Sequence, residues 1–169
     1  PGQGLPHPQR DPAEQHQGGE ADRGEVPPFE IVLVGVPEAD LPVDLAPAVR
    51  TRLRALGRLP EADLARHYAE AHAVLAPSRY ESFGLVYQEG LAFGRPMVAS
   101  MEDASAREFV GATGAGRMAA ENTGAALADA MRPLVADPAT RTALRAKALQ
   151  AAGRFTRASL GTQTLALYG

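Results

Sequence analysis

A stretch in the middle of the chain, residues 73–99, constrains the fold more than any other part of the sequence. Its two ends, Ala-Val-Leu-Ala at 73–76 and Met-Val-Ala at 97–99, have the length and apolar composition of buried strands. The helical pattern between them stops at Gly94 and Pro96, since glycine suits the left-handed position after a helix and proline prevents its continuation. A strand, a helix and a second strand in this order form a βαβ unit, and such units build parallel sheets.

The rest of the ordered sequence repeats this alternation of short apolar strands and helices. The run from Phe29 to Gly35 is apolar and β-branched, which is typical of a strand covered on both faces. The sequence therefore predicts an α/β fold, a single Rossmann-like lobe with a mainly parallel sheet and helices on both faces. The predicted strands are 29–35, 52–56, 73–76 and 97–99; the predicted helices are 60–71, 83–93, 123–135, a longer one beyond Asp137-Pro138 and a last one at 157–168; short helical pieces fall within 37–51 and 106–110, and a glycine-rich loop covers 111–116.

Residues 1–28 differ sharply from the rest of the chain. They contain six prolines and five glycines, and few aliphatic side chains. Such a segment cannot bury enough apolar surface to offset the entropy lost on ordering. We therefore expect a flexible tail at 1–28 and a folded lobe at 29–169.

The composition excludes several classes of function. The chain of 169 residues has no cysteine, which excludes disulfides and cysteine nucleophiles and is compatible with the cytoplasmic location that we expect. The net charge of −3 offers no surface for a polyanion, so nucleic acid is not an expected partner. No apolar run approaches the roughly 18 residues that suggest a membrane-spanning helix, and contact with a membrane surface stays open.

A candidate site lies at the start of the predicted 83–93 helix. Ligands of parallel α/β sheets bind beyond the carboxyl ends of the strands, and the loop 77–82 leaves such an end. The first N–H groups of a helix lack partners and attract anions, with Ser82 as the expected N-cap. Gly84 has no side chain, so an anion can approach the backbone there; the same glycine could instead permit close packing of the helix on the sheet.

Two carboxylates flank this helix start. Glu81 precedes it and Glu89 follows eight residues later, and both can accept hydrogen bonds from the hydroxyl groups of a sugar. The order of groups suits a nucleotide-sugar, with its sugar, diphosphate and ribose. By themselves, two glutamates at this spacing are more often solvated surface residues.

The whole stretch resembles a known signature. Pro-Ser-x-Tyr-Glu-x-Phe-Gly-Leu, continued by Glu-Gly-Leu-Ala-Phe-Gly-Arg-Pro-Met-Val-Ala-Ser, is similar to the Glu-x7-Glu motif of the group 1 retaining glycosyltransferases. Those enzymes have two Rossmann-like lobes, the GT-B architecture, and the C-terminal lobe holds the donor. The resemblance covers about residues 29–169. It implies a donor-binding lobe that transfers a hexosyl group from a nucleotide-sugar, with retention, when joined to an N-terminal acceptor lobe.

The resemblance also implies roles for individual residues. Glu81 would be the catalytic residue and would contact hydroxyls of the donor sugar, and Glu89 would bind the ribose. The nucleoside-diphosphate-sugar is the donor substrate, and neither a cofactor nor a metal is expected, because protein groups stabilise the departing diphosphate in this family. The main chain expected to hold the sugar and the diphosphate belongs to Ser82, Phe83, Gly84 and Leu85.

The sequence departs from the family pattern in several places. The acceptor lobe is missing, and so is the first strand–helix unit of the donor lobe, which carries the basic clamp for the diphosphate. Arg79 and Arg95 are candidates to replace that clamp, although surface roles suit both. The glycine pair expected after the 97–99 strand is replaced by residues 102–105. The chain alone is therefore expected to be inactive, and the alternative is a non-catalytic remnant acting as a nucleotide-sugar-binding or interaction module.

A dinucleotide-binding oxidoreductase is a second alternative, because residues 114–119 fit the pattern G-x-G-x-x-A. That fingerprint requires a buried strand before it and a helix after it. Here a predicted helical turn precedes it and polar residues follow, which excludes the oxidoreductase.

Overall fold

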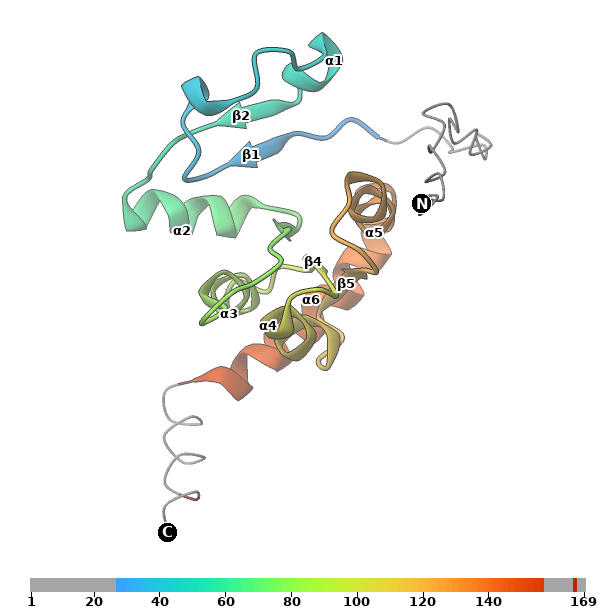
Figure 1. Ribbon diagram of the computed structural model, residues 1–169. Coiled ribbons are helices and arrows are strands. Elements are labelled where there is room, and N and C mark those ends of the chain that lie inside the picture. Colours follow the sequence, from blue (N-terminus) through green and yellow to red (C-terminus); the bar gives the residue numbers. More distant parts are fainter. Residues whose placement is uncertain (1–26, 157–165, 167–169) are drawn as a thin grey trace, which may run out of the picture.

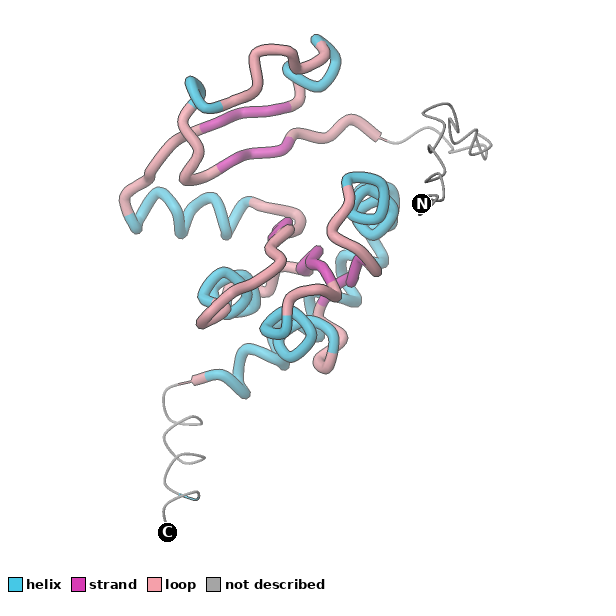
Figure 2. Tube along the Cα trace, viewed as in Figure 1, coloured by secondary structure: helices cyan, strands magenta, loops and turns pink. Residues whose placement is uncertain are grey.

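The computed structural model describes residues 27–156 and Ala166 (Figures 1 and 2). Every strand pair in this part of the chain is parallel. The predicted α/β class is therefore confirmed. The strands are β1 (Ile31–Leu33), β2 (Leu53–Ala55), β3 (Val74–Ala76), β4 (Met97–Ser100) and β5 (Gly116–Ala119). The helices are α1 (Pro47–Arg50), α2 (Glu61–Glu70), α3 (Leu85–Ala92), α4 (Ala104–Ala106), α5 (Gly124–Ala136) and α6 (Pro138–Ala152), with 3-10 turns at Glu38–Asp40 and Gly153–Phe155 and a π turn at Arg107–Gly111.

Strand β4 is the centre of the larger sheet, whose order is β3-β4-β5. All four residues of β4 are fully buried. Met97 and Ala99 face a cluster built from α3 and α6, whereas Val98 packs against Leu134 and Leu144 on the other side. Since successive side chains of a strand point to opposite faces, this alternation confirms that helices cover both faces of the sheet.

Strands β1 and β2 form a separate two-stranded sheet. In Figure 1 this pair lies apart from β3, β4 and β5, and the chain passes from it through α2. The residues of β1 are only half-buried, and Val34 beyond it is exposed, so the prediction of a strand covered on both faces was wrong. Ile31 and Leu33 form backbone hydrogen bonds with the segment that contains β2. Because the backbone groups of successive residues in a strand point to opposite sides, those of Val32 point away from β2.

Strand β5 is not predicted by the sequence, which indicates a loop at residues 111–116. The strand contains glycine, arginine, methionine and alanine, without the β-branched or aromatic residues that mark strands. The backbone of Gly116 lies so close to β4 that a Cβ atom there would clash with the carbonyl oxygen of Met97. Close approach to β4, rather than strand propensity, therefore explains why the first residue of β5 is a glycine.

The helices agree with the sequence patterns to within a few residues. Helix α6 buries Leu144, Ala148 and Ala151 on one face. The predicted tail at 1–28 lies outside the described residues except for Pro27 and Pro28, and the predicted last helix at 157–168 lies outside them except for Ala166. Within the described part of the chain, no helix is both long and apolar enough to cross a membrane.

We predict that Gly116→Ala destabilises the chain by about 1–3 kcal/mol, the usual penalty for overpacking a tight interior site. The added methyl group would push against the main chain of Met97, which cannot move without breaking the ladder between β4 and β5. Gly124→Ala is the matched control, because a Cβ atom at Gly124 meets nothing within 4 Å. Urea denaturation of both variants measures the difference, and equal midpoints would contradict the packing argument.

Candidate functional site

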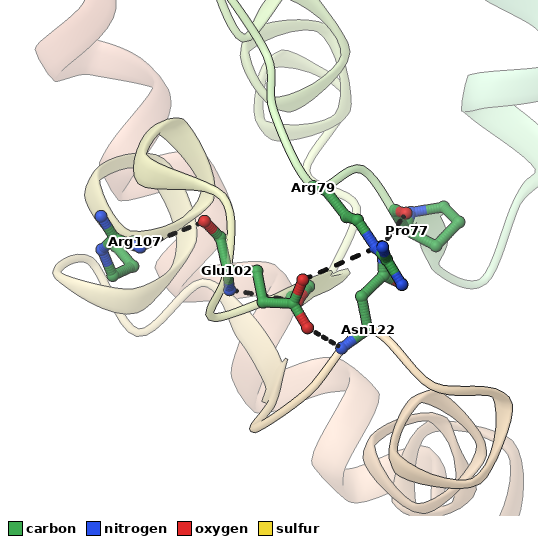
Figure 3. A network of polar contacts seen from close by, with 6 residues as sticks. Pro77, Arg79, Glu102, Arg107 and Asn122 are labelled. Carbon is green, nitrogen blue, oxygen red and sulfur yellow. Dashed lines mark hydrogen bonds and ion pairs between the residues drawn. The ribbon is translucent and has the colours of Figure 1, made fainter. Parts of the chain in front are cut away.

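The loops that follow β3, β4 and β5 lie at one edge of the larger sheet, because parallel strands end on the same side. Glu102, in the loop after β4, connects the three loops (Figure 3). Its carboxylate accepts a hydrogen bond from the N–H of Asn122 at 2.8 Å and forms an ion pair with Arg79 at 3.6 Å. Asn122 also donates to the carbonyl of Pro77 at 2.8 Å, and Arg107 donates to that of Glu102 at 3.4 Å. The edge of the sheet where a ligand is expected is thus held together by side chains.

The sequence predicts that this helix begins at Phe83, but α3 begins at Leu85. Its N-cap is Gly84, in the left-handed conformation with φ of 59°, so the prediction of Ser82 as N-cap was wrong. The N–H groups of Leu85 and Val86 have no acceptor within the described residues. They are the donors that a helix start offers to an anion.

The structure gives a packing reason for Gly84. The residue is buried, and a Cβ atom there would lie 2.9 Å from the ring of Phe109 and 3.2 Å from that of Tyr87. The left-handed backbone also disfavours any other residue. The packing is against the π turn and against α3 itself, and not against the sheet as the sequence suggested, so the side of Gly84 on which a Cβ atom would lie is covered.

Glu81 is held by hydrogen bonds on its side chain and its main chain. Its Oε1 accepts a hydrogen bond from Ser78 Oγ at 2.9 Å. Its N–H donates to Asp103 Oδ1 at 3.3 Å, and its carbonyl accepts from Ser105 Oγ at 2.8 Å. The half-buried carboxylate that the resemblance selected therefore has a defined position.

Tyr87 and Asp103 form a fully buried pair, and Asp103 also accepts the hydrogen bond from the N–H of Glu81. The hydroxyl of Tyr87 donates to Asp103 Oδ2 at 2.6 Å, and neither side chain is exposed. Burial raises the pKa of Tyr87 well above its ordinary value, and the hydrogen bond to Asp103 and the negative charges of Asp103 and Glu81 raise it further. This phenol therefore stays protonated and keeps donating to Asp103 at neutral and mildly alkaline pH.

Glu89 lies on the exposed side of α3, where Tyr68 of α2 donates a hydrogen bond to its Oε2 at 2.8 Å. The ring of Tyr68 stacks on that of Phe93, with centroids 5.4 Å apart. Burial raises the pKa of Tyr68, and its hydrogen bond to Glu89 and the charge of Glu89 add to the shift. One oxygen of Glu89 is thus oriented by a neighbouring helix, and the carboxylate remains accessible to a ligand.

The remaining predicted site residues lie in the loop before α3. Ser82 and Phe83 are exposed, and the Phe83 ring projects into solvent with 78% of its surface accessible. The carbonyl of Phe83 accepts a hydrogen bond from the side-chain amide of Gln88 at 3.0 Å. The loop and the first turn of α3 therefore form one connected segment.

The sequence did not reveal the part played by Asp103 and Ser105. Asp103 caps α4 by accepting a hydrogen bond from the N–H of Ser105, and an aspartate before Ala-Ser-Ala is a recognisable capping signal. The contacts with Glu81 join residues 22 and 24 positions apart, and no local pattern predicts such contacts.

The two arginines proposed as phosphate-binding groups differ in the structure. Arg95 donates to the carbonyls of Ala71 at 2.8 Å and of Ala69 at 2.7 Å, so it ties the end of α2 to the segment before β4. Burial, together with the nearby Arg145, lowers its pKa. Arg79 is 74% exposed and has only the long ion pair with Glu102 among the described residues, so it is the arginine that a ligand can reach.

Among the described residues, no group of three or more His, Asp or Glu side chains could hold a metal ion. The G-x-G-x-x-A segment at 114–119 leads from a loop into β5, so it lacks the strand-to-helix setting of a dinucleotide fingerprint.

A model of the family described as "Glycosyl transferases group 1" matches residues 20–137 of the chain. A D-inositol 3-phosphate glycosyltransferase of Kineococcus radiotolerans is 35% identical over 156 residues, which cover 83% of this chain and 36% of that protein. The O-antigen chain mannosyltransferase B of Escherichia coli is 34% identical, over 69% of this chain and 30% of that protein. The chain thus spans about a third of the length of the curated relatives it matches.

Two solved structures are similar in fold. Sucrose-phosphate synthase from Thermosynechococcus elongatus superimposes with a TM-score of 0.61 and 29% identity, over 72% of this chain and 30% of that one. WaaG, a glycosyltransferase involved in lipopolysaccharide biosynthesis, gives a TM-score of 0.56 and 21% identity, over 63% of this chain and 28% of that one. At this identity the likeness to WaaG concerns the fold alone.

We predict that the buried tyrosine makes stability fall at high pH. Above pH 10 the unfolded chain releases the proton of Tyr87 while the folded chain retains it, so the free energy of unfolding falls by up to about 1.4 kcal/mol per pH unit from this group. Tyr87→Phe removes that contribution and also leaves Asp103 without one donor. The variant should therefore be less stable at pH 7 but lose less stability between about pH 9 and 11.

Urea denaturation of both proteins at several pH values checks this prediction. An identical decline in wild type and Tyr87→Phe would contradict it.

Proposed function

The chain belongs to the group 1 glycosyltransferases, and we propose that it is the part of such an enzyme that binds the sugar donor. One observation carries the proposal. At the carboxyl edge of the sheet, Glu81 is fixed by hydrogen bonds four residues before Leu85, the first residue of α3, and the first N–H groups of this helix have no acceptor in the described chain. One short segment thus carries both a carboxylate that can bind hydroxyl groups and N–H groups that can bind an anion.

The proposed donor is a nucleoside-diphosphate-sugar. Its sugar hydroxyls would bind Glu81, and its diphosphate would lie on the main chain from Ser82 to Leu85, where the dipole of α3 favours negative charge. Glu89 would bind the ribose hydroxyls. It lies one turn beyond Leu85, about 6 Å along the axis at 1.5 Å per residue, which suits a diphosphate between the two sugars.

The proposed reaction is transfer of a hexosyl group with retention. The bond between the anomeric carbon and the diphosphate breaks, and a bond to an acceptor hydroxyl oxygen forms on the same face of the sugar. The hydroxyl proton passes to the departing nucleoside diphosphate. Glu81 would act as the catalytic residue by fixing the sugar at the reacting centre, and hydrogen-bond donors would stabilise the leaving group without a metal. The acceptor would come from an N-terminal lobe, so this chain alone would bind the donor and transfer nothing.

Arg79 is the proposed cationic partner of the diphosphate. It follows β3 on the same loop as Glu81, and its weak ion pair with Glu102 can be exchanged for a phosphate. Arg95 is unsuitable because its guanidinium group already binds two carbonyls. A single exposed arginine is a modest clamp, and this observation favours the second candidate, a non-catalytic remnant that binds a nucleotide-sugar or another protein.

We predict that the two glutamates contribute differently to binding. Glu81→Gln should weaken binding of a nucleotide-sugar about tenfold, as expected for hydrogen bonds to a charged group, and leave the free nucleoside diphosphate unaffected. Glu89→Gln should weaken the binding of both ligands by a similar factor, because both contain the ribose. Isothermal titration with UDP-glucose, GDP-mannose, UDP and GDP provides the measurement.

The control variant is Glu70→Gln, an exposed glutamate of α2, which should bind as the wild type does. The proposed function fails if the wild type binds none of the ligands, or if all variants bind them equally. Binding without sugar transfer when the chain is joined to an acceptor lobe would support the non-catalytic remnant.

A further inference from the structure

Asp103 is a buried acid that the proposed reaction does not use. Its side chain is fully buried at the end of β4, although carboxylates are rarely buried without strong compensation. Both of its oxygens are occupied: Oδ2 accepts from Tyr87, and Oδ1 accepts from the N–H groups of Glu81 and Ser105. Capping α4 requires only the contact with Ser105, so the cap does not explain the other two hydrogen bonds.

Ser105, in the adjoining helix α4, completes the arrangement. Its N–H donates to Asp103, and its hydroxyl donates to the carbonyl of Glu81 at 2.8 Å. The N–H and the carbonyl of Glu81 are thus both bound by one short segment, residues 103–105. The main chain of Glu81 is fixed at two points to the segment that follows β4, which is the most buried strand of the sheet.

These contacts leave the Glu81 carboxylate available for a ligand. Asp103 and Ser105 bind only the main chain of Glu81, and Ser78 occupies only Oε1. Within the described residues Oε2 has no hydrogen-bond partner. A fixed main chain with one uncommitted carboxylate oxygen is what binding a hydroxyl in a defined orientation requires.

We propose that Asp103 and Ser105 are positioning residues that hold Glu81 for the donor sugar, a role that rests on the proposed function. Asp103 accepts a hydrogen bond from the N–H of Glu81, and Ser105 donates one to its carbonyl. Tyr87 in turn holds Asp103 by donating a hydrogen bond to it. Contacts from the side chains of Asp103 and Ser105 thus position the main chain of Glu81 in this chain.

The first test needs no ligand and follows hydrogen exchange at the amide of Glu81. Asp103→Ala should speed this exchange at least tenfold, because the amide loses its acceptor. Asp103→Asn should restore most of the protection, since its side-chain oxygen can still accept. Thr113→Ala is the matched control: Thr113 is half-buried and donates to the carbonyl of Phe109, but it does not contact Glu81.

The second test measures sugar selectivity, defined as the Kd of UDP or GDP divided by that of UDP-glucose or GDP-mannose. Ser105→Ala should lower the selectivity about fivefold, as for one lost hydrogen bond, while the Kd of the free diphosphate stays within about twofold. Thr113→Ala should lower the unfolding midpoint about as much as Ser105→Ala does, but it should leave the sugar selectivity unchanged. Ser105→Ala keeps the test decisive if Asp103→Ala does not fold.

The outcomes separate this inference from the proposed function. A wild type that binds neither ligand class overturns the proposed function, and the role in sugar binding with it. A wild type that binds the sugars, together with unchanged selectivity in Ser105→Ala, overturns the positioning role alone. The positioning role is also overturned if Ser105→Ala loses equal affinity for the free diphosphate and for the nucleotide-sugar. It is overturned as well if hydrogen exchange at the amide of Glu81 is unaltered in Asp103→Ala and Asp103→Asn.

Discussion

The complete burial of β4 is the constraint on which the rest of the structure depends. A strand with apolar contacts on both faces can satisfy its backbone only through strands on both edges, and β3 and β5 provide them. Helices α3 and α6 cover one face, and α5 with the start of α6 covers the other. This layering brings the loops after the three strands to one edge, where Glu81, Asp103 and Asn122 come together.

The sequence predicted those parts of the fold in which local pattern and tertiary need agree. Met97, Val98 and Ala99 are apolar, and the strand is buried on both faces. The prediction from the sequence failed where a contact between the backbone and a residue distant in the sequence decides the structure. Position 116 of β5 requires glycine because a Cβ atom would clash with the carbonyl of Met97, and position 84 requires glycine because a Cβ atom would clash with the ring of Phe109. Neither neighbour can be inferred from the residues next to the glycine.

The candidate site shows the same division. Glu81 and Glu89 were selected by spacing and by resemblance, and the structure gives each a hydrogen-bonded position. The residues that set these positions, among them Tyr68 and Asp103, were not selected. They belong to other elements, and their partners are fixed by how α2 and the loop after β4 pack. A motif identifies the groups that meet a ligand, whereas the groups that orient them depend on the tertiary fold.

The separation of β1 and β2 from the larger sheet has a consequence for the isolated chain in solution. A two-stranded sheet of half-exposed residues is marginal by itself, so this unit should open more readily than the layers around β4. The backbone groups of Val32 that point away from β2 form an unpaired edge in the described chain. Such an edge is a template for a further strand, and at high concentration another copy of the chain is the nearest source. Self-association through this edge is therefore the expected route to aggregation.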